Sequence, residues 1–306
     1  MSAPDVGAGW VDRPAPPAES AAGATRRRPR APRAPTPGAP AAPIGLALLA
    51  LLGASAVLAP LLAPYDPRLA TGRPFDAPSS LHPLGTNDIG QDILSELIWG
   101  ARASLFVGVL AALGATALGT VAGALAGYHR GALDALLMRL VDAALVVPSL
   151  PLIVLLAAYL GPSTWNLAFV IGALLWARAA RVIRAQALAL AQLDYVLAAR
   201  TLGADHGRVL ARHLLPGLLP LVLAEFVQLA SAAILLEASL SFLGLGDPVQ
   251  KSWGTMLFYA QARGAFLTGA WLWWVLPAGL CITATVFGFA LLGLTLEPVA
   301  NPRLRR

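Results

Sequence analysis

The chain reads YVLAARTLGADHGRVLARHLLPGLLP at residues 195–220, a polar and basic interruption between two strongly apolar runs. Apolar and small side chains at helical spacing predict a short first helix that ends near Gly203, where the left-handed conformation is needed. Asp205 is placed to cap a second short helix. Pro216 can open the next apolar run, because the first turn of a helix does not use its N–H. The segment therefore predicts a helix–Gly–helix element, which we call the elbow (residues 195–216).

The elbow lies in a chain with the composition of a membrane protein. Hydrophobic residues make up 57% and charged residues only 12%, against about 25% charged in ordinary soluble domains. Apolar runs long enough to cross a bilayer recur along the chain. We predict an all-α integral membrane protein with six transmembrane helices, at residues 44–63, about 103–127, 143–160, 161–180, 216–243 and 271–296.

Small residues repeat within the second of these runs, at Gly108, Gly114, Gly119 and Gly123. Small residues let membrane helices approach closely, so the pattern favours a tightly packed helix over specific lining of a pore. Pro148 and Pro151 lie in the third run, which we still expect to form one span, because neighbours in a bundle can satisfy freed backbone groups.

The basic residues predict the orientation, because Lys and Arg concentrate in cytoplasmic loops. Most of the 22 lie in the N-terminal tail, in two loops and at the C-terminus, all on one side of the predicted spans. Both termini and the elbow are therefore expected in the cytoplasm. The basic excess is explained by orientation and anionic lipid, and nucleic acid is not an expected partner.

The order Ala198-Ala199, Gly203, Leu214 and Pro216 resembles the "EAA" loop of permease subunits in binding-protein-dependent ABC importers. In that family the loop fits a groove on the ATPase subunit. One departure is Leu197, which stands where a glutamate usually opens the motif. Without the resemblance, the segment could be an ordinary amphipathic loop between membrane helices.

Two further blocks resemble the dipeptide, oligopeptide and nickel branch of this family, and its C-type permease in particular. They are HPLGTNDIGQDILSELIWGARASL at residues 82–105, and EASLSFLGLG at 237–246 followed by SWG at 252–254. From spacing alone, Asp88, Asp92 and Glu96 should share one helix face, as a solvated cap or as a contact for an external partner.

The resemblance implies a type I ABC importer permease in the cell membrane, with this organisation: a disordered Pro/Ala/Arg-rich cytoplasmic tail (1–43), a first span (44–63), an external loop (64–102), a permease domain (103–296) with a coupling loop (184–215), and a cytoplasmic C-terminus (297–306). It also implies three kinds of protein partner: a homologous second permease, two ATPase subunits and an extracytoplasmic solute-binding protein.

The same resemblance assigns ATPase coupling to the elbow. Gly203 would set its angle, Ala198 and Ala199 would permit close approach, and Arg208 with Arg212 would present charge. The full candidate set is Tyr195, Ala198, Ala199, Gly203, Asp205, Arg208, Arg212, Leu214 and Pro216.

The sequence contains no pattern expected of an enzyme. The single lysine, Lys251, lies in no glycine-rich phosphate loop, so any ATP must be hydrolysed by partner subunits. The four histidines show no metal-ligand spacing and join no nucleophile motif. We expect no catalytic residue, no bound metal and no cofactor in this chain.

Glu225 is the one candidate for the translocation path, because an ionised carboxylate deep in a membrane helix faces the protein interior or water. It could equally pair with a hydroxyl or a partner subunit and hold helices together. Peptides are the expected substrate, with nickel as the alternative inside the family. The rival from another class is a stand-alone secondary transporter or proton channel that uses Glu225.

Overall fold

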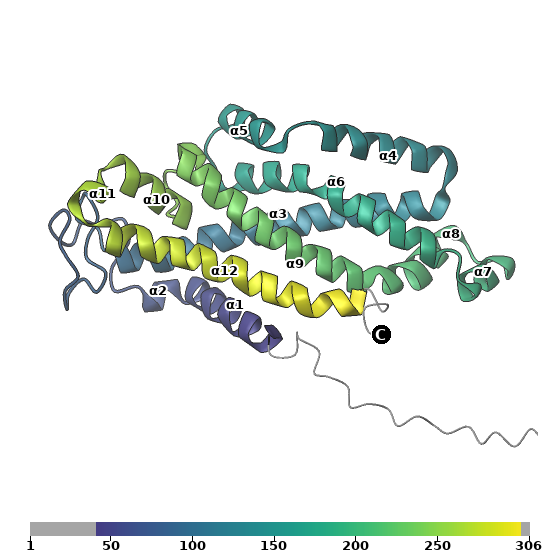
Figure 1. Ribbon diagram of the computed structural model, residues 1–306, viewed down its shortest axis with the longest axis horizontal. Coiled ribbons are helices and arrows are strands. Elements are labelled where there is room, and N and C mark those ends of the chain that lie inside the picture. Colours follow the sequence, from purple (N-terminus) through teal and green to yellow (C-terminus); the bar gives the residue numbers. More distant parts are fainter. Residues whose placement is uncertain (1–40, 301–306) are drawn as a thin grey trace, which may run out of the picture. The chain divides into compact units, whose positions relative to one another are not determined.

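The computed structural model describes the backbone of residues 41–300 and the side chains of residues 41–296, which belong to one compact unit. Every regular element in that part of the chain is a helix, so the all-α class is confirmed (Figure 1). The predicted tail lies almost entirely outside the described residues, as do residues 301–306. The first helix, α1 (Ala41–Val57), begins within the stretch predicted to be tail.

Four helical stretches are long and apolar enough to cross a membrane. They are α3 (Ile93–His129), α6 (Thr164–Leu190), the run His206–Leu245 and α12 (Trp271–Ala300), and their long axes run along the same direction of the bundle (Figure 1). The run His206–Leu245 joins α8 (His206–Val209), the π-helix η1 (Leu210–Leu214), α9 (Leu215–Leu240) and the π-helix η2 (Ser241–Leu245).

The predicted span at 143–160 does not form one continuous helix. Helix α4 (Gly131–Val146) and helix α5 (Ser149–Leu160) meet at a bend of 86°. Pro148 explains the break, since it has no N–H to donate and it drives the preceding residue out of the helical region. Val147 accordingly has ψ 128°.

The number of spans among the described residues is four, or five if the bent α4–α5 pair crosses as one. The predicted first span forms the 17-residue α1, followed by the single turn α2 (Ala59–Leu62) with Pro60 in its first turn. A straight helix needs about 20 residues to cross the hydrocarbon core. The helix lengths therefore do not support six full-length spans.

Close packing of α3 against α6 confirms the role predicted for the small residues. A Cβ atom at Gly119, Gly123 or Gly127 would lie 2.7, 2.5 or 2.6 Å from an atom of α6. One at Gly108 would overlap Ile234 of α9. Only glycine allows these backbones to meet. Gly114 differs, because nothing lies within 4 Å of its added Cβ.

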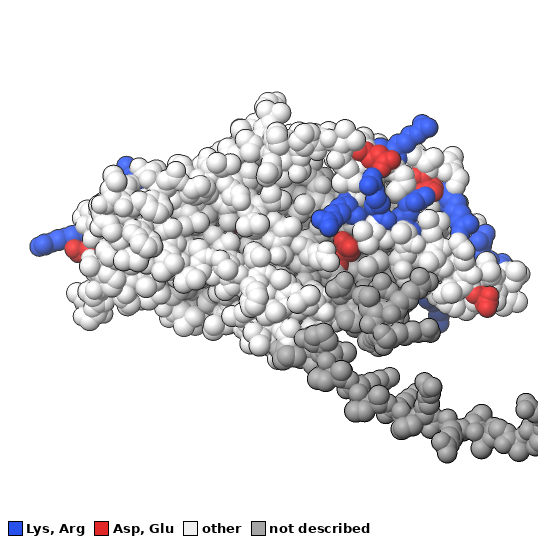
Figure 2. Space-filling view, viewed as in Figure 1, with Lys and Arg blue, Asp and Glu red and all other residues white. Residues whose placement is uncertain are grey.

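The charged side chains divide the surface of the bundle into zones. Lys and Arg gather towards the end that carries α7 (Asp194–Thr201) and α8, which we call the Arg-rich end, and an uncharged stretch of the visible face separates them from the few charged side chains at the other end (Figure 2). Two ion pairs lie near this end, Arg181 with Asp142 and Arg184 with Asp134. An uncharged middle is what a bilayer requires of a spanning protein.

The opposite end is built by residues 63–92, α10 (Trp253–Ala262) and α11 (Ala265–Thr268) (Figure 1). The prediction that Asp88, Asp92 and Glu96 share a helix face is wrong, because α3 begins only at Ile93. Asp92 is instead its N-cap and accepts hydrogen bonds from the backbone N–H and the hydroxyl of Ser95.

Candidate functional site

The elbow has the local geometry that the sequence predicts. Helix α7 is followed by Gly203 with φ +83°, a conformation that glycine adopts without strain. Asp205 caps α8, where its Oδ2 accepts a hydrogen bond of 2.9 Å from the N–H of Gly207. Pro216 lies in the first turn of α9. The conformations of Gly203 and Asp205 are confirmed, whereas Pro216 lies within a helical run that continues from α8. The docking role of the elbow stays a prediction.

Three apolar side chains anchor the elbow to its own bundle. Val196, Val209 and Leu214 are fully buried in one cluster with Ala187 of α6 and Tyr128 of α3. Leu214, which the sequence placed in the coupling set, is thus an internal anchor and does not face a partner. Burial of such side chains contributes about 1.5–3 kcal/mol each. The elbow is therefore held firmly against the helix ends.

A polar contact strengthens this attachment. The hydroxyl of Tyr128 lies 2.9 Å from Nδ1 of His206, and the guanidinium of Arg200 lies 5.9 Å from the centre of the Tyr128 ring. Cation–π contacts of this kind add about 0.5–1 kcal/mol at exposed sites. The sequence analysis missed both contacts, and nothing in the spacing of Tyr128 and His206 would have revealed them.

The outward side of the elbow is apolar and exposed. Tyr195, Leu197 and Leu202 are 48%, 44% and 88% exposed, and Ala198 is exposed between them while Ala199 is half-buried. Arg208 and Arg212 are also exposed. These exposed apolar side chains are available for contact with a partner. Leu197, in the place of the usual glutamate, is one of them.

Glu225 lies in a cavity of about 370 Å³ at the bend between α4 and α5, which we call the break cavity. Glu225 is only 8% exposed, and Arg178 of α6 and Gln228 of α9 line the same cavity. Val147, Pro148 and Ser149 form its edge. The sequence analysis missed Arg178 and Gln228 here, although Pro148 could have indicated the bend.

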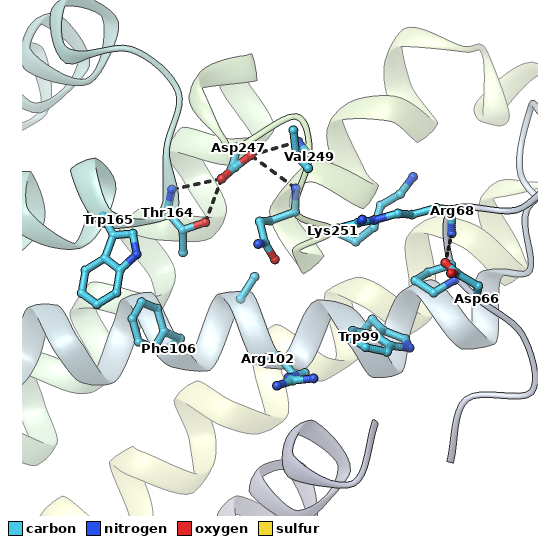
Figure 3. A pocket seen from close by; sticks show the side chains of 13 residues that line it. Asp66, Arg68, Trp99, Arg102, Phe106, Thr164, Trp165, Asp247, Val249 and Lys251 are labelled. Atoms are coloured by element: carbon cyan, nitrogen blue, oxygen red, sulfur yellow. Dashed lines mark hydrogen bonds between the residues drawn. The ribbon is translucent and has the colours of Figure 1, made fainter. Parts of the chain in front are cut away.

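A second cavity, of about 540 Å³, lies at the opposite end (Figure 3). Asp247 organises one wall by accepting hydrogen bonds from the hydroxyl of Thr164 at 3.1 Å and from the N–H of Val249 at 2.9 Å. On α3, the guanidinium of Arg102 lies 5.1 Å from the centre of the Trp99 ring. The hydrogen bonds of Asp247 tie the start of α6 to the loop that precedes α10.

A buried ion pair closes the same end of the bundle. Lys251 Nζ lies 2.6 Å from the carboxylate of Glu96, which also accepts a hydrogen bond of 2.9 Å from Asn87. The pair is nearly buried, with 18% and 2% of the side chains exposed. Glu237 is buried as well, and it accepts a hydrogen bond from Ser241. Glu237 thus has a structural partner of its own.

A bundle of long apolar helices with charged side chains towards its ends is the structure of an integral membrane protein (Figure 2). The described residues contain no group of three His, Cys, Asp or Glu side chains able to hold a metal ion. The chain belongs to the family of binding-protein-dependent transport system inner membrane components, whose profile matches residues 119–306. It is a membrane permease subunit of an ABC importer.

Similarity to named peptide permeases extends over most of the chain. It is 34% identical over 253 residues to the dipeptide transport system permease protein DppC of Bacillus subtilis, covering 82% of this chain and 78% of the relative. It is 36% identical over 254 residues to the oligopeptide permease OppC of the same organism, covering 82% of each. The glutathione permease GsiD of Pectobacterium atrosepticum is 35% identical over 255 residues, with 82% and 83% covered.

Proposed function

We propose that this chain is the C-type permease of an ATP-driven importer that moves peptides across the cell membrane. The relatives with this extent of similarity are named for dipeptides, oligopeptides and the tripeptide glutathione. By this proposal two ATPase subunits hydrolyse the ATP, a solute-binding protein delivers the peptide outside, and a homologous permease supplies the other half of the pathway.

The single observation that carries the proposal is the elbow. It presents exposed apolar side chains (Tyr195, Leu197, Leu202), and its inner side is fixed by Val196, Val209 and Leu214. A rigid element of this kind passes the movement of a bound partner to the helices it is anchored to. Closure of the ATPases on ATP would thus be transmitted to α3, α6 and α9, and the peptide would pass beside Glu225.

Reconstitution tests the proposal. The chain, expressed together with its neighbouring genes, should co-purify with an ATPase and a second permease. Proteoliposomes of that complex should accumulate a labelled dipeptide only when ATP and the binding protein are present. Passage of solute into vesicles that contain this chain alone would support the rival secondary transporter or channel and would overturn the proposal.

A further inference from the structure

The break cavity has the size and the chemistry of a small-ligand site. Its volume of about 370 Å³ falls in the range of about 300–1,000 Å³ that such sites occupy. An acidic and a basic side chain, Glu225 and Arg178, line the same space together with the amide of Gln228. Apolar residues such as Leu174 and Leu229 form the rest of the wall.

Glu225 has no ion pair or hydrogen bond among the described residues, and Arg178 is the opposite charge that lies beside it in this space. Glu225 is 92% buried by its exposed fraction of 8%, yet within residues 41–296 its carboxylate joins none of the ion pairs that other charged residues form. The same holds for Arg178, which is exposed. Glu237, the other buried glutamate of α9, accepts a hydrogen bond from Ser241 at one oxygen, while its Oε2 is buried without a partner among the described residues. A buried carboxylate without a partner is costly, so a ligand that supplies one would bind favourably.

The end of a helix adds a third group. The 12-residue α5 begins at Ser149 on the edge of the break cavity, and no side chain caps it. A helix N-terminus carries a partial positive charge and free N–H groups that attract a carboxylate. Broken membrane helices that present such ends to a substrate are a recurring feature of transport proteins.

We propose that the break cavity binds the two charged ends of a peptide in transit. Glu225 accepts the α-ammonium group, and Arg178 with the N-terminus of α5 holds the α-carboxylate. A simple cation does not suit this site, because Arg178 and the positive helix end would oppose it. The inference rests on the proposed function and names the substrate groups that this part of the pathway recognises.

The test measures occupancy of the cavity without relying on transport. The single cysteine, Cys281, is replaced by alanine, Gln228→Cys is introduced as a reporter, and the full importer complex is placed in nanodiscs. Alkylation of the reporter is followed with and without alanyl-alanine. At about ten times its dissociation constant the dipeptide should slow alkylation about tenfold, because the free fraction falls as 1/(1 + [L]/Kd).

Charge dependence decides between this site and simple crowding. The protection should vanish for N-acetyl-alanyl-alaninamide, which carries neither terminal charge, and should be lost with alanyl-alanine in Glu225→Gln and in Arg178→Gln. Glu237→Gln is the matched control, because it changes a buried glutamate of the same helix outside the break cavity, and it should keep the protection. The comparison of the two peptides needs no substitution at either charge, so it stands even if a variant fails to assemble.

Absence of protection by alanyl-alanine, or equal protection by the capped peptide, would overturn the inference. ATP-driven import of a dipeptide by the same complex is measured in parallel. Import without protection would remove this inference alone, whereas failure of import would remove the proposed function.

Discussion

The hydroxyl of Tyr128 lies 2.9 Å from Nδ1 of His206, although 78 residues separate the two in sequence. Tyr128 is near the end of the 37-residue α3, and His206 is the first residue of α8. The contact therefore links the elbow to a helix that runs the length of the bundle. Together with Val196 and Val209 it makes the elbow an extension of the membrane helices.

Removal of this hydroxyl should loosen the elbow. Tyr128→Phe loses one partly buried hydrogen bond, a change of about 0.5–1.5 kcal/mol. Hydrogen exchange of the amides in α7 and α8 should become faster, and peptide import should fall more than ATP hydrolysis. Tyr159→Phe is the control, since Tyr159 is 86% exposed on α5. Unchanged exchange in Tyr128→Phe would contradict the anchoring role.

Gly203→Val should abolish import while the protein still inserts into the membrane. Gly203 has φ +83° and nothing within 4 Å of an added Cβ, so the strain is confined to the backbone. A left-handed conformation costs a non-glycine residue about 1–2 kcal/mol, more readily relieved by turning α7 away from α8 than by unfolding the bundle. Membrane fractionation and dipeptide uptake measure the two effects. Normal uptake would count heavily against the coupling mechanism.

Gly123→Ala should destabilise the bundle, because the new Cβ would lie 2.5 Å from the carbonyl oxygen of Ala180. Forced separation of packed elements costs about 1–3 kcal/mol. Gly114→Ala is the matched control in the same helix, since its Cβ meets nothing within 4 Å, and alanine favours a helix. Thermal unfolding in detergent should show a lower midpoint for Gly123→Ala only. Equal midpoints would mean that α3 and α6 are not closely packed.

Lys251→Met should destabilise the end of the bundle opposite the elbow. It leaves Glu96, of which 2% of the side chain is exposed, without its cation, and breaking one side of a buried pair costs about 3–5 kcal/mol. Arg181→Met is the control, because that pair is 56% and 62% exposed, where the effect is about 1 kcal/mol or less. The double variant Glu96→Gln/Lys251→Met should recover much of the loss in thermal unfolding. A single variant as stable as the native chain would show that the pair is not formed.

The helical class, the small-residue packing and the punctuation of the elbow could be predicted because each depends on local chemistry. A left-handed glycine and an Asx cap act within a few residues, and Gly203 and Asp205 behave as expected. Apolar run length likewise identifies α3, α6, α9 and α12.

The bend at Pro148, the cap at Asp92 and the position of Arg178 could not be predicted, because each depends on interactions that a hydropathy or spacing pattern does not show. Hydropathy continues smoothly through Pro148, so the run 143–160 reads as one helix, while the missing N–H bends it by 86°. Asp88, Asp92 and Glu96 have helical spacing, yet Asp92 serves as a cap and the helix starts after it. Arg178 meets the cavity of Glu225 only through the packing of α6 against α9, which no single segment encodes.

The glycine contacts between α3 and α6 imply that these two helices move as one rigid unit, to which the elbow is attached. A sharp bend of 86° lies at Val147 and Pro148 between α4 and α5, and Glu225 lines the cavity beside it. A displacement of the elbow would therefore change the shape of the break cavity without deforming α3 and α6. By the proposed function, ATP binding by the partner ATPases would then change the affinity of the break cavity for the peptide.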